Sequence, residues 1–261
     1  MTALLEAREL CVARGPREIL RELTLSLSAG EAVALVGPNA AGKSTLVRSL
    51  AGLLAPRQGQ VWLLGRPLAE WSREAVARVL ALVTPLDEGP DTFAVRDRVA
   101  LGRYPHRGPF RPFSRADEEA INRALRQTEI EHLARRRLLT LSAGERQLAT
   151  LARGLAQEPQ VLLLDEPAAH LDIGHQLHLF RVLDEVRAKG VAVLAVVHDL
   201  QRAAAWAQRM LLLDQGRFTA QGPPAEVLGS QACALAFGVA IRGHRLPGLP
   251  SPLYHFDTPN A

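Results

Sequence analysis

A glycine-rich segment constrains the fold of this chain more than any other feature, because it lies between a predicted strand and a predicted helix. The segment reads GPNAAGKST and runs from Gly37 to Thr45. It follows EAVALVG, an apolar strand of residues 31–37 that ends in glycine. Sequences of the form G-x-x-x-x-G-K-[ST] surround phosphates with backbone N–H groups and with the positive end of a helix. The segment therefore predicts a strand–loop–helix unit that binds nucleotide phosphates, and the alternative of a chance glycine-rich turn does not explain these flanks.

The helix after this loop is predicted over residues 43–54, with Leu46, Leu50 and Leu53 on one apolar stripe. Within the loop, Lys43 is expected to hold the β and γ phosphates, and the hydroxyl of Ser44 to reach Mg²⁺. The whole run is expected to contact the nucleotide, namely Gly37, Pro38, Asn39, Ala40, Ala41, Gly42, Lys43, Ser44 and Thr45.

Further strands alternate with helices, which favours a mostly parallel sheet. VLLLD at 161–165 and VAVLAVV at 191–197 are continuous aliphatic runs, typical of strands buried on both faces. Between them lies an amphipathic helix that Gly190 is placed to end, with an apolar stripe made of Leu179, Val182, Leu183 and Val186.

The middle of the chain differs, since residues 91–156 show helical patterns and no convincing strand. One of these helices is opened by Ser114, with Asp117 as the partner of a capping box. Residues from about 231 onward are rich in proline and predict a peripheral extension or a loosely held tail. We therefore expect a single domain over 1–261, with a core at 1–90 and 157–230, a helical subdomain at 91–156 and an extension at 231–261.

Composition narrows the function. The chain has 261 residues, of which 48% are hydrophobic, enough for a substantial core. No stretch of about 18 apolar residues is present, so any membrane role is expected to come through a partner. Cys11 and Cys233 lie far apart, without metal or disulfide spacing. The net charge is +4, but the arginines are scattered, so nucleic acid is not an expected partner.

Two adjacent carboxylates, Asp165 and Glu166, stand at the end of the VLLLD strand. Asp165 is predicted to join the magnesium shell with Ser44, and Glu166 to polarise the attacking water as general base. A solvated turn is the alternative for a bare Asp-Glu pair. The glycine-rich loop earlier in the chain favours the catalytic interpretation.

With these elements in place, LSAGERQ at 141–147 resembles the signature motif of ABC ATPases, usually L-S-G-G-Q/E. The resemblance implies that Ser142 and Gly144, with Glu145, sit at a helix N-terminus and bind the γ-phosphate of ATP held by another subunit. It therefore implies a head-to-tail homodimer. On its own, S-x-G-E indicates only a helix start with a serine cap.

Two more elements of that family follow in order. HLD at 170–172 resembles the D-loop at the dimer interface, with Asp172 near the nucleotide, and His198 resembles the histidine that contacts the γ-phosphate. His170, His175 and His178 also allow a metal site as an alternative. A D-loop that enters a helix explains these histidines without a metal.

The resemblance covers residues 7 to about 229 and implies an α/β fold: a P-loop NTPase (RecA-like) core with an antiparallel β region and an inserted helical subdomain. LGRYPHRG at 101–108 and DEPAAHLDIGHQ at 165–176 are similar to the ATPases of importers for ferric siderophores, haem and cobalamin. This implies ATP hydrolysis with Mg²⁺ at the cytoplasmic face of a membrane, integral-membrane permease subunits and a substrate-binding protein.

Two positions depart from the family pattern. The first strand offers no aromatic residue for adenine, and Arg14 stands at about that position. No glutamine lies between Val61 and Gln127, so the expected Q-loop glutamine is replaced near Thr84 or Pro85, with Asp87 nearby. Two alternatives to an importer therefore stay open: a non-transport ABC ATPase of translation or DNA repair, and a nucleotide-gated regulatory clamp with impaired hydrolysis.

Overall fold

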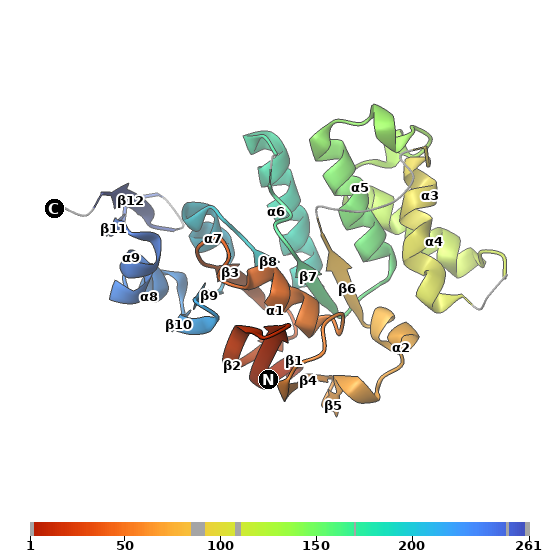
Figure 1. The fold of residues 1–261 in the computed structure, drawn as a ribbon. Helices are drawn as coiled ribbons and strands as arrows, with labels where there is room; N and C mark the ends of the chain where they lie inside the picture. Colours follow the sequence, from red (N-terminus) through yellow and green to blue (C-terminus); the bar gives the residue numbers. More distant parts are fainter. Residues whose placement is uncertain (1–2, 85–91, 108–110, 170, 249–250, 259–261) are drawn as a thin grey trace.

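The central element of the fold is a six-stranded sheet (Figure 1), seen in a computed structural model that describes residues 3–84, 92–107, 111–169, 171–248 and 251–258. Its strand order is β10-β9-β3-β8-β7-β6, and only β10 runs antiparallel to its neighbour. The strands are β3 (Ala32–Val36), β6 (Leu80–Val83), β7 (Val161–Leu164), β8 (Ala192–Val196), β9 (Arg209–Asp214) and β10 (Arg217–Gly222). The predicted strands after residues 31, 161 and 191 are thus confirmed.

Alternate residues of the central strands face two different hydrophobic clusters, as the two-residue period of a strand requires. Val33 and Leu35 pack with helix α1 (Lys43–Leu50), whereas Ala34 packs on the opposite side. A second, antiparallel sheet closes the α1 side in the order β2-β1-β4-β5. Its strands are β1 (Ala3–Arg14), β2 (Arg17–Ser28), β4 (Gln58–Leu63) and β5 (Arg66–Pro67), followed by helix α2 (Arg73–Ala77).

Helix α1 is shorter than the sequence predicted. Leu46 and Leu50 are fully buried, but Leu53 is 65% exposed and lies beyond the helix. Gly52 takes a left-handed conformation with φ 73°, which ends the helix before Leu53 can join its apolar stripe.

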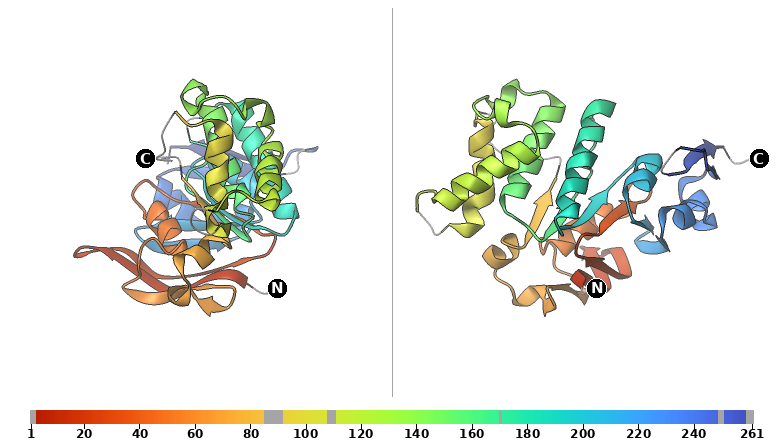
Figure 2. Two further views of the ribbon diagram at one scale, coloured as in Figure 1. Left: turned by 90° about the vertical axis from the view of Figure 1, so that its right-hand side faces the viewer. Right: turned by 180° about the vertical axis from the view of Figure 1, so that it is seen from behind.

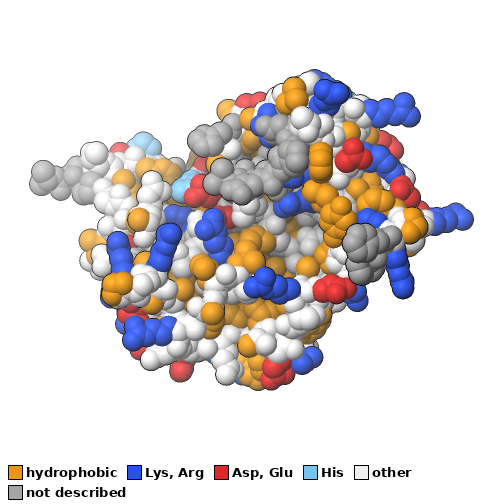
Figure 3. All heavy atoms as spheres, turned by 45° about the vertical axis from the view of Figure 1, so that its right-hand side comes forward, with side chains coloured by type: hydrophobic (Ala, Val, Ile, Leu, Met, Phe, Trp, Pro, Cys, Tyr) orange, Lys and Arg blue, Asp and Glu red, His pale blue; other side chains and the backbone are white. Residues whose placement is uncertain are grey.

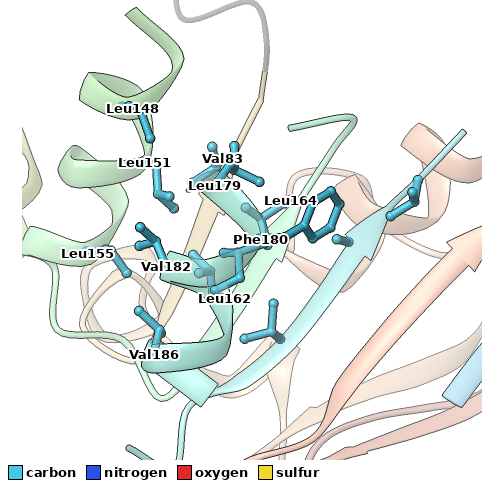
Figure 4. Packing of buried hydrophobic residues seen from close by; sticks show 14 of the residues in the cluster. Val83, Leu148, Leu151, Leu155, Leu162, Leu164, Leu179, Phe180, Val182 and Val186 are labelled. Atoms are coloured by element: carbon cyan, nitrogen blue, oxygen red, sulfur yellow. The ribbon is translucent and has the colours of Figure 1, made fainter. Parts of the chain in front are cut away.

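Helices from the middle and the second half of the chain cover the other face of the sheet. Here α5 (Ala143–Ala156) and α6 (Ile173–Ala188) pack side by side through leucine and valine side chains (Figure 4). Burying one such side chain contributes about 1.5–3 kcal/mol. Gly190 follows the end of α6 with φ 94°, as predicted, and α7 (Leu200–Trp206) lies beyond β8.

The predicted helical segment contains α3 (Val95–Ala100), α4 (Arg115–Gln127) and α5. Between them lie the 3₁₀ turns η2 (Leu101–His106), η3 (Glu131–Leu133) and η4 (Leu138–Thr140). Figure 2 shows these helices as a lobe beside the sheet. Ser114 and Asp117 form the predicted capping box at the start of α4. Within 92–107 and 111–156 the structure has no strand, although Ala94 and Arg137 form one isolated bridge.

The LGRYPH segment fixes this lobe to its surroundings. A Cβ atom added at Gly102 would lie 2.2 Å from the carbonyl oxygen of Arg153, so only glycine permits this approach to α5. The buried guanidinium of Arg103 donates to Asp117 at 2.9 Å. His106 Nε2 lies 2.8 Å from the carbonyl oxygen of Gln157. These contacts explain in structural terms why the segment carries a glycine, an arginine and a histidine at these positions.

The last part of the chain is more ordered than a loose tail. After α8 (Pro224–Leu228), it forms α9 (Gln231–Phe237) and an antiparallel pair of strands, β11 (Ala240–His244) and β12 (Leu253–Asp257). Gln201 binds this pair through the carbonyl of Pro252 at 3.1 Å and the N–H of Tyr254 at 2.7 Å. The prolines interrupt the chain between elements, which is why proline content alone left a peripheral extension and a loose tail as alternatives.

Candidate active site

The predicted phosphate, carboxylate and histidine groups lie at the carboxyl ends of neighbouring parallel strands. The glycine-rich loop follows β3, Asp165 and Glu166 follow β7, and His198 comes two residues after β8. These strands are adjacent in the order β3-β8-β7. In open α/β sheets this edge is where ligands bind.

Lys43 is held inside the glycine-rich loop. Its Nζ atom donates to the carbonyl oxygens of Gly37 at 2.7 Å and Pro38 at 2.8 Å. Burial lowers the pKa of Lys43, an effect that the carboxylates of Glu166 and Asp165 oppose. The loop thus holds a buried amine close to the helix N-terminus, as phosphate binding requires.

The start of α1 lacks the side-chain cap that most helices have. Gly42 stands at the N-cap with φ 107° and accepts no side-chain hydrogen bond, so the first-turn N–H groups have no side-chain acceptor. A Cβ added at Gly37 would lie 2.0 Å from the carbonyl oxygen of Leu213, so the start of the loop packs closely against β9. These donors fit the phosphates of a nucleotide.

Ser44 and Asp165 form the other half of the site. The Ser44 hydroxyl donates to Oδ1 of Asp165 at 3.0 Å, from residues 121 positions apart. Burial raises the pKa of Asp165, partly offset by the hydrogen bond from Ser44. A hydroxyl and a buried carboxylate are oxygen donors of the kind that Mg²⁺ takes together with nucleotide phosphates, so these residues fit the predicted metal.

Glu166 and His198 lie within hydrogen-bonding distance, with 2.7 Å between Oε1 and Nε2. Both side chains are partly open to solvent. Glu166 has a left-handed backbone with φ 52°, an uncommon conformation for a non-glycine residue and one that clusters at functional sites.

The residues of the LSAGERQ segment lie at a different helix start. Ser142 caps α5 by accepting from the N–H of Glu145, and the Glu145 carboxylate accepts from the N–H of Ser142 at 2.8 Å. The N–H of Ser142 lowers the pKa of Glu145. Within the described ranges, no hydrogen bond or ion pair joins Ser142 or Glu145 to Lys43, Asp165 or His198. The two groups of predicted site residues stay separate within one chain.

Asp172 caps α6, because its Oδ1 accepts from the N–H of His175 at 2.9 Å. His170 lies outside the described residues. In the described part of the chain, no group of three or more His, Cys, Asp or Glu side chains is arranged to hold a metal ion.

The match to a known family settles what this arrangement belongs to. Residues 20–169 match the ABC transporter family, more than half of the chain. The chain belongs to the ABC transporter family. It is an ATP-binding subunit of this family, with ATPase activity coupled to transport.

Curated relatives of this ABC subunit match over most of their length. The ferric enterobactin transport ATP-binding protein FepC of Escherichia coli (strain K12) is 39% identical over 91% of this chain and 88% of its own length. The hemin import ATP-binding protein HmuV of Nocardia farcinica (strain IFM 10152) is 45% identical over 86% and 79%. The dimeric post-hydrolysis structure of the ATP-binding cassette MJ0796 with ADP and Pi shares the fold, with a TM-score of 0.74, 22% identity and coverage of 84% and 98%.

The departures from the family pattern have structural counterparts. A cavity of about 370 Å³ beside the glycine-rich loop is lined by Asn39 and by Arg17, whereas Arg14 is not among its lining residues. Thr84 follows β6 beside Asp165, and Pro85 and Asp87 lie outside the described residues. No helix in the described part of this ABC subunit is long and apolar enough to cross a membrane.

Sequence reasoning missed one contact at the site. The ring of His175 covers Gly144. These two residues lie on different helices, α6 and α5, and far apart in the chain. The only signal was a glycine near the start of a predicted helix, where glycine is unfavourable.

Proposed function

We propose that this chain is the ATPase of an importer, and that ATP hydrolysis at its β3-β8-β7 edge drives uptake of an iron complex, a ferric siderophore or haem, through separate membrane subunits. The iron complex is supported by the two relatives, which are named for ferric enterobactin and hemin. Cobalamin is a third candidate cargo, supported by the motif resemblance alone.

The main support for hydrolysis is the Glu166–His198 pair beside the Ser44–Asp165 hydrogen bond. In this proposal Glu166 accepts a proton from the attacking water, and His198 orients Glu166 and the γ-phosphate. Lys43 and the N–H groups of residues 37–45 hold the phosphates in line for attack. Positioning of this kind supplies most of the catalysis in phosphoryl transfer.

Ser44 and Asp165 would hold Mg²⁺, which when bound neutralises phosphate charge. The Asp165 carboxylate is buried, and the Ser44 hydroxyl lies 3.0 Å from it as a second oxygen donor for the metal.

A head-to-tail homodimer would complete the site. The capped start of α5 carries Ser142, Gly144 and Glu145, and none of these joins the phosphate loop of the same chain among the described contacts. We propose that they bind the nucleotide of a second copy, with Asp172 at the same interface. The dimeric cassette that shares this fold supports the arrangement.

The membrane partner would dock in a groove of about 700 Å³ between the core and the helical lobe. One wall comes from the segment that follows α1, including the exposed Leu53, and from α2. The other wall comes from η2, including the exposed Tyr104. Figure 3 shows hydrophobic side chains in the middle of the face that it presents, with Lys and Arg side chains around them. A short amphipathic helix of the partner would fit, because aromatic and aliphatic anchors with a charged rim are typical of interfaces.

Two hydrogen bonds link the walls of this groove. Arg78 donates to the carbonyl of Pro105 at 2.6 Å, and Gln157 donates to the carbonyl of Ala77 at 3.0 Å. A partner seated there would contact both the part that carries Lys43 and the part that carries Ser142. It could thus transmit closure of the dimer to the membrane.

A reconstituted transport assay tests this function. The chain would be co-expressed with membrane permease subunits of an iron-complex importer and placed in proteoliposomes, and uptake of ferric siderophore, haem and cobalamin would be measured with and without ATP. ATP-dependent uptake of an iron complex is expected, and it should vanish with Glu166→Gln. Uptake of cobalamin alone would contradict the iron assignment.

The missing glutamine between Val61 and Gln127 favours one other function, a nucleotide-gated clamp that hydrolyses slowly. It predicts ATP-dependent dimerisation without transport, and slow turnover that the permease does not stimulate. Turnover stimulated by the permease would exclude it.

A further inference from the structure

Gly144 is the second residue of α5, and its backbone conformation does not require glycine. It does not take a left-handed conformation, unlike Gly42 or Gly190. Glycine inside a helix costs about 1 kcal/mol relative to alanine. The absence of a side chain at this position therefore needs a steric reason.

That reason is the imidazole of His175, which comes from α6. A Cβ atom added at Gly144 would lie 2.2 Å from Cδ2, 2.4 Å from Cγ and 2.7 Å from Nε2 of His175. These separations are far below van der Waals contact, so any side chain at Gly144 would displace the ring. The ring thus packs directly on the backbone at the start of α5.

Asp172 holds the other side of the same ring. Its Oδ2 atom lies 2.7 Å from Nδ1 of His175, and its Oδ1 accepts from the N–H of the same residue at 2.9 Å. The hydrogen bonds from the His175 N–H and ring lower the pKa of Asp172, so the carboxylate is ionised and Nδ1 donates. One of these bonds holds the ring and the other holds the backbone of the same residue, so the carboxylate of Asp172 orients the His175 side chain.

We propose that His175 is a positioning residue that holds the starts of α5 and α6 together, with Asp172 on one side and Gly144 on the other. Gly144 and Asp172 then meet the nucleotide of the second subunit as one rigid face. This inference rests on the proposed function, in which both residues lie at the dimer interface. His175 itself touches no nucleotide and acts through these two neighbours.

His178 supplies a matched control, because it lies one turn further along α6. Its Nε2 is 3.4 Å from Oε2 of Glu129, which also accepts from Arg181 at 2.8 Å. His178 therefore also joins α6 to the lobe, but it contacts neither Gly144 nor Asp172 in the described contacts. Its removal tests whether any lost link between α6 and the lobe has the same effect.

The experiment uses the full chain carrying Glu166→Gln, so that bound ATP is not consumed. Nucleotide binding would be followed with a fluorescent ATP analogue, dimer formation by analytical ultracentrifugation over a range of ATP concentrations, and folding by thermal unfolding. His175→Ala is expected to raise the ATP concentration needed for half-maximal dimerisation by about tenfold or more. The loss of one well-placed interaction can change an affinity by this factor. ATP binding to the monomer and the midpoint of unfolding should change little.

Two further variants separate positioning from folding. His175→Asn keeps a donor near the place of Nδ1 and should restore most of the dimerisation, whereas His178→Ala should leave it unchanged. Gly144→Ala should impair dimerisation. Adding His175→Ala to this variant should raise the ATP concentration for half-maximal dimerisation by a smaller factor than it does in the parent, because the effects of residues in contact are coupled.

The outcomes divide cleanly. Dimerisation of His175→Ala at the ATP concentration of its parent would overturn the positioning role and leave the proposed function standing. A parent that binds ATP but never dimerises would overturn the head-to-tail dimer itself, and with it this inference.

Discussion

The Nε2 atom of His198 lies 2.7 Å from Oε1 of Glu166, although the two residues follow different strands. Neighbouring parallel strands bring them together, and the left-handed backbone of Glu166 lets its carboxylate meet the ring. In the proposed mechanism this pair aligns the base with the water and the γ-phosphate.

Replacing His198 by alanine should therefore lower the turnover number by about 10²-fold, the scale of a lost acid–base or orienting group. The Kd for ATP should change little, because Lys43 and the loop remain. His255→Ala is the matched control, since His255 also pairs with a carboxylate, Asp257, at 2.8 Å but lies in β12. Phosphate release and ATP titrations measure both quantities, and equal turnover in the two variants would contradict the role of His198.

Gly37→Ala should displace the phosphate loop, because the added methyl group would lie 2.0 Å from the carbonyl oxygen of Leu213. We expect weaker ATP binding and a loss of about 1–3 kcal/mol or more in the free energy of unfolding, typical of overpacking. Gly65→Ala separates backbone strain from this clash, because Gly65 has φ 75° and nothing within 4 Å of the added atom. The left-handed backbone should make this substitution cost about 1–2 kcal/mol in the free energy of unfolding, and ATP binding should stay intact.

Asp117 should make stability depend on pH in the acid range. Burial would raise its pKa, but hydrogen bonds from Ser114 and Arg103 outweigh this and lower the pKa to about 2. Because the folded pKa lies below the unfolded value of about 3.9, the stabilisation is fully present above pH 4 and is lost as pH falls towards 2.

Asp117→Asn should accordingly reduce the free energy of unfolding near pH 7 by about 1–2 kcal/mol after allowance for solvent screening, with a smaller difference near pH 2. Urea unfolding at several pH values measures it. Glu119→Gln is the control, since among the described residues Glu119 pairs only with the exposed Arg115. A constant difference between parent and Asp117→Asn from pH 7 to pH 2 would contradict the assignment.

Leu53 offers a test of the groove. Leu53→Glu puts a charge on an exposed wall residue, so it should weaken co-purification with the permease several-fold and reduce transport, while ATP binding by the isolated chain stays as in the parent. Leu235→Glu, at a leucine that is 73% exposed on α9, is the comparison. Equal loss with both variants would indicate a general effect of charge and not docking in the groove.

Local patterns predicted much of this fold. The aliphatic runs at 161–165 and 191–197 became central strands, and Ser114 and Ser142 cap helices as their sequences indicated, because these features depend on neighbours within a few residues. Leu53 was misplaced because one left-handed glycine ends α1 early. A helical repeat cannot reveal such a break.

Features that depend on contacts between distant residues could not be predicted from the sequence. The His175–Gly144 packing joins two helices, and the groove has walls from separate parts of the chain, so neither leaves a pattern in any one segment. The C-terminal strand pair is held by Gln201, which is more than 50 positions away from Pro252 and Tyr254. Proline-rich composition therefore left a peripheral extension and a loose tail as alternatives, and the tertiary contacts make it an ordered extension.

The most direct test of the account is steady-state ATP hydrolysis by the full chain beside Lys43→Ala and Glu166→Gln, with and without Mg²⁺. The parent should hydrolyse ATP only with Mg²⁺, and both variants should fall by about 10²-fold or more, as expected when a phosphate-holding amine or a general base is removed. Glu166→Gln should still bind ATP. Hydrolysis by Glu166→Gln at the rate of the parent would contradict the central claim that Glu166 is the base.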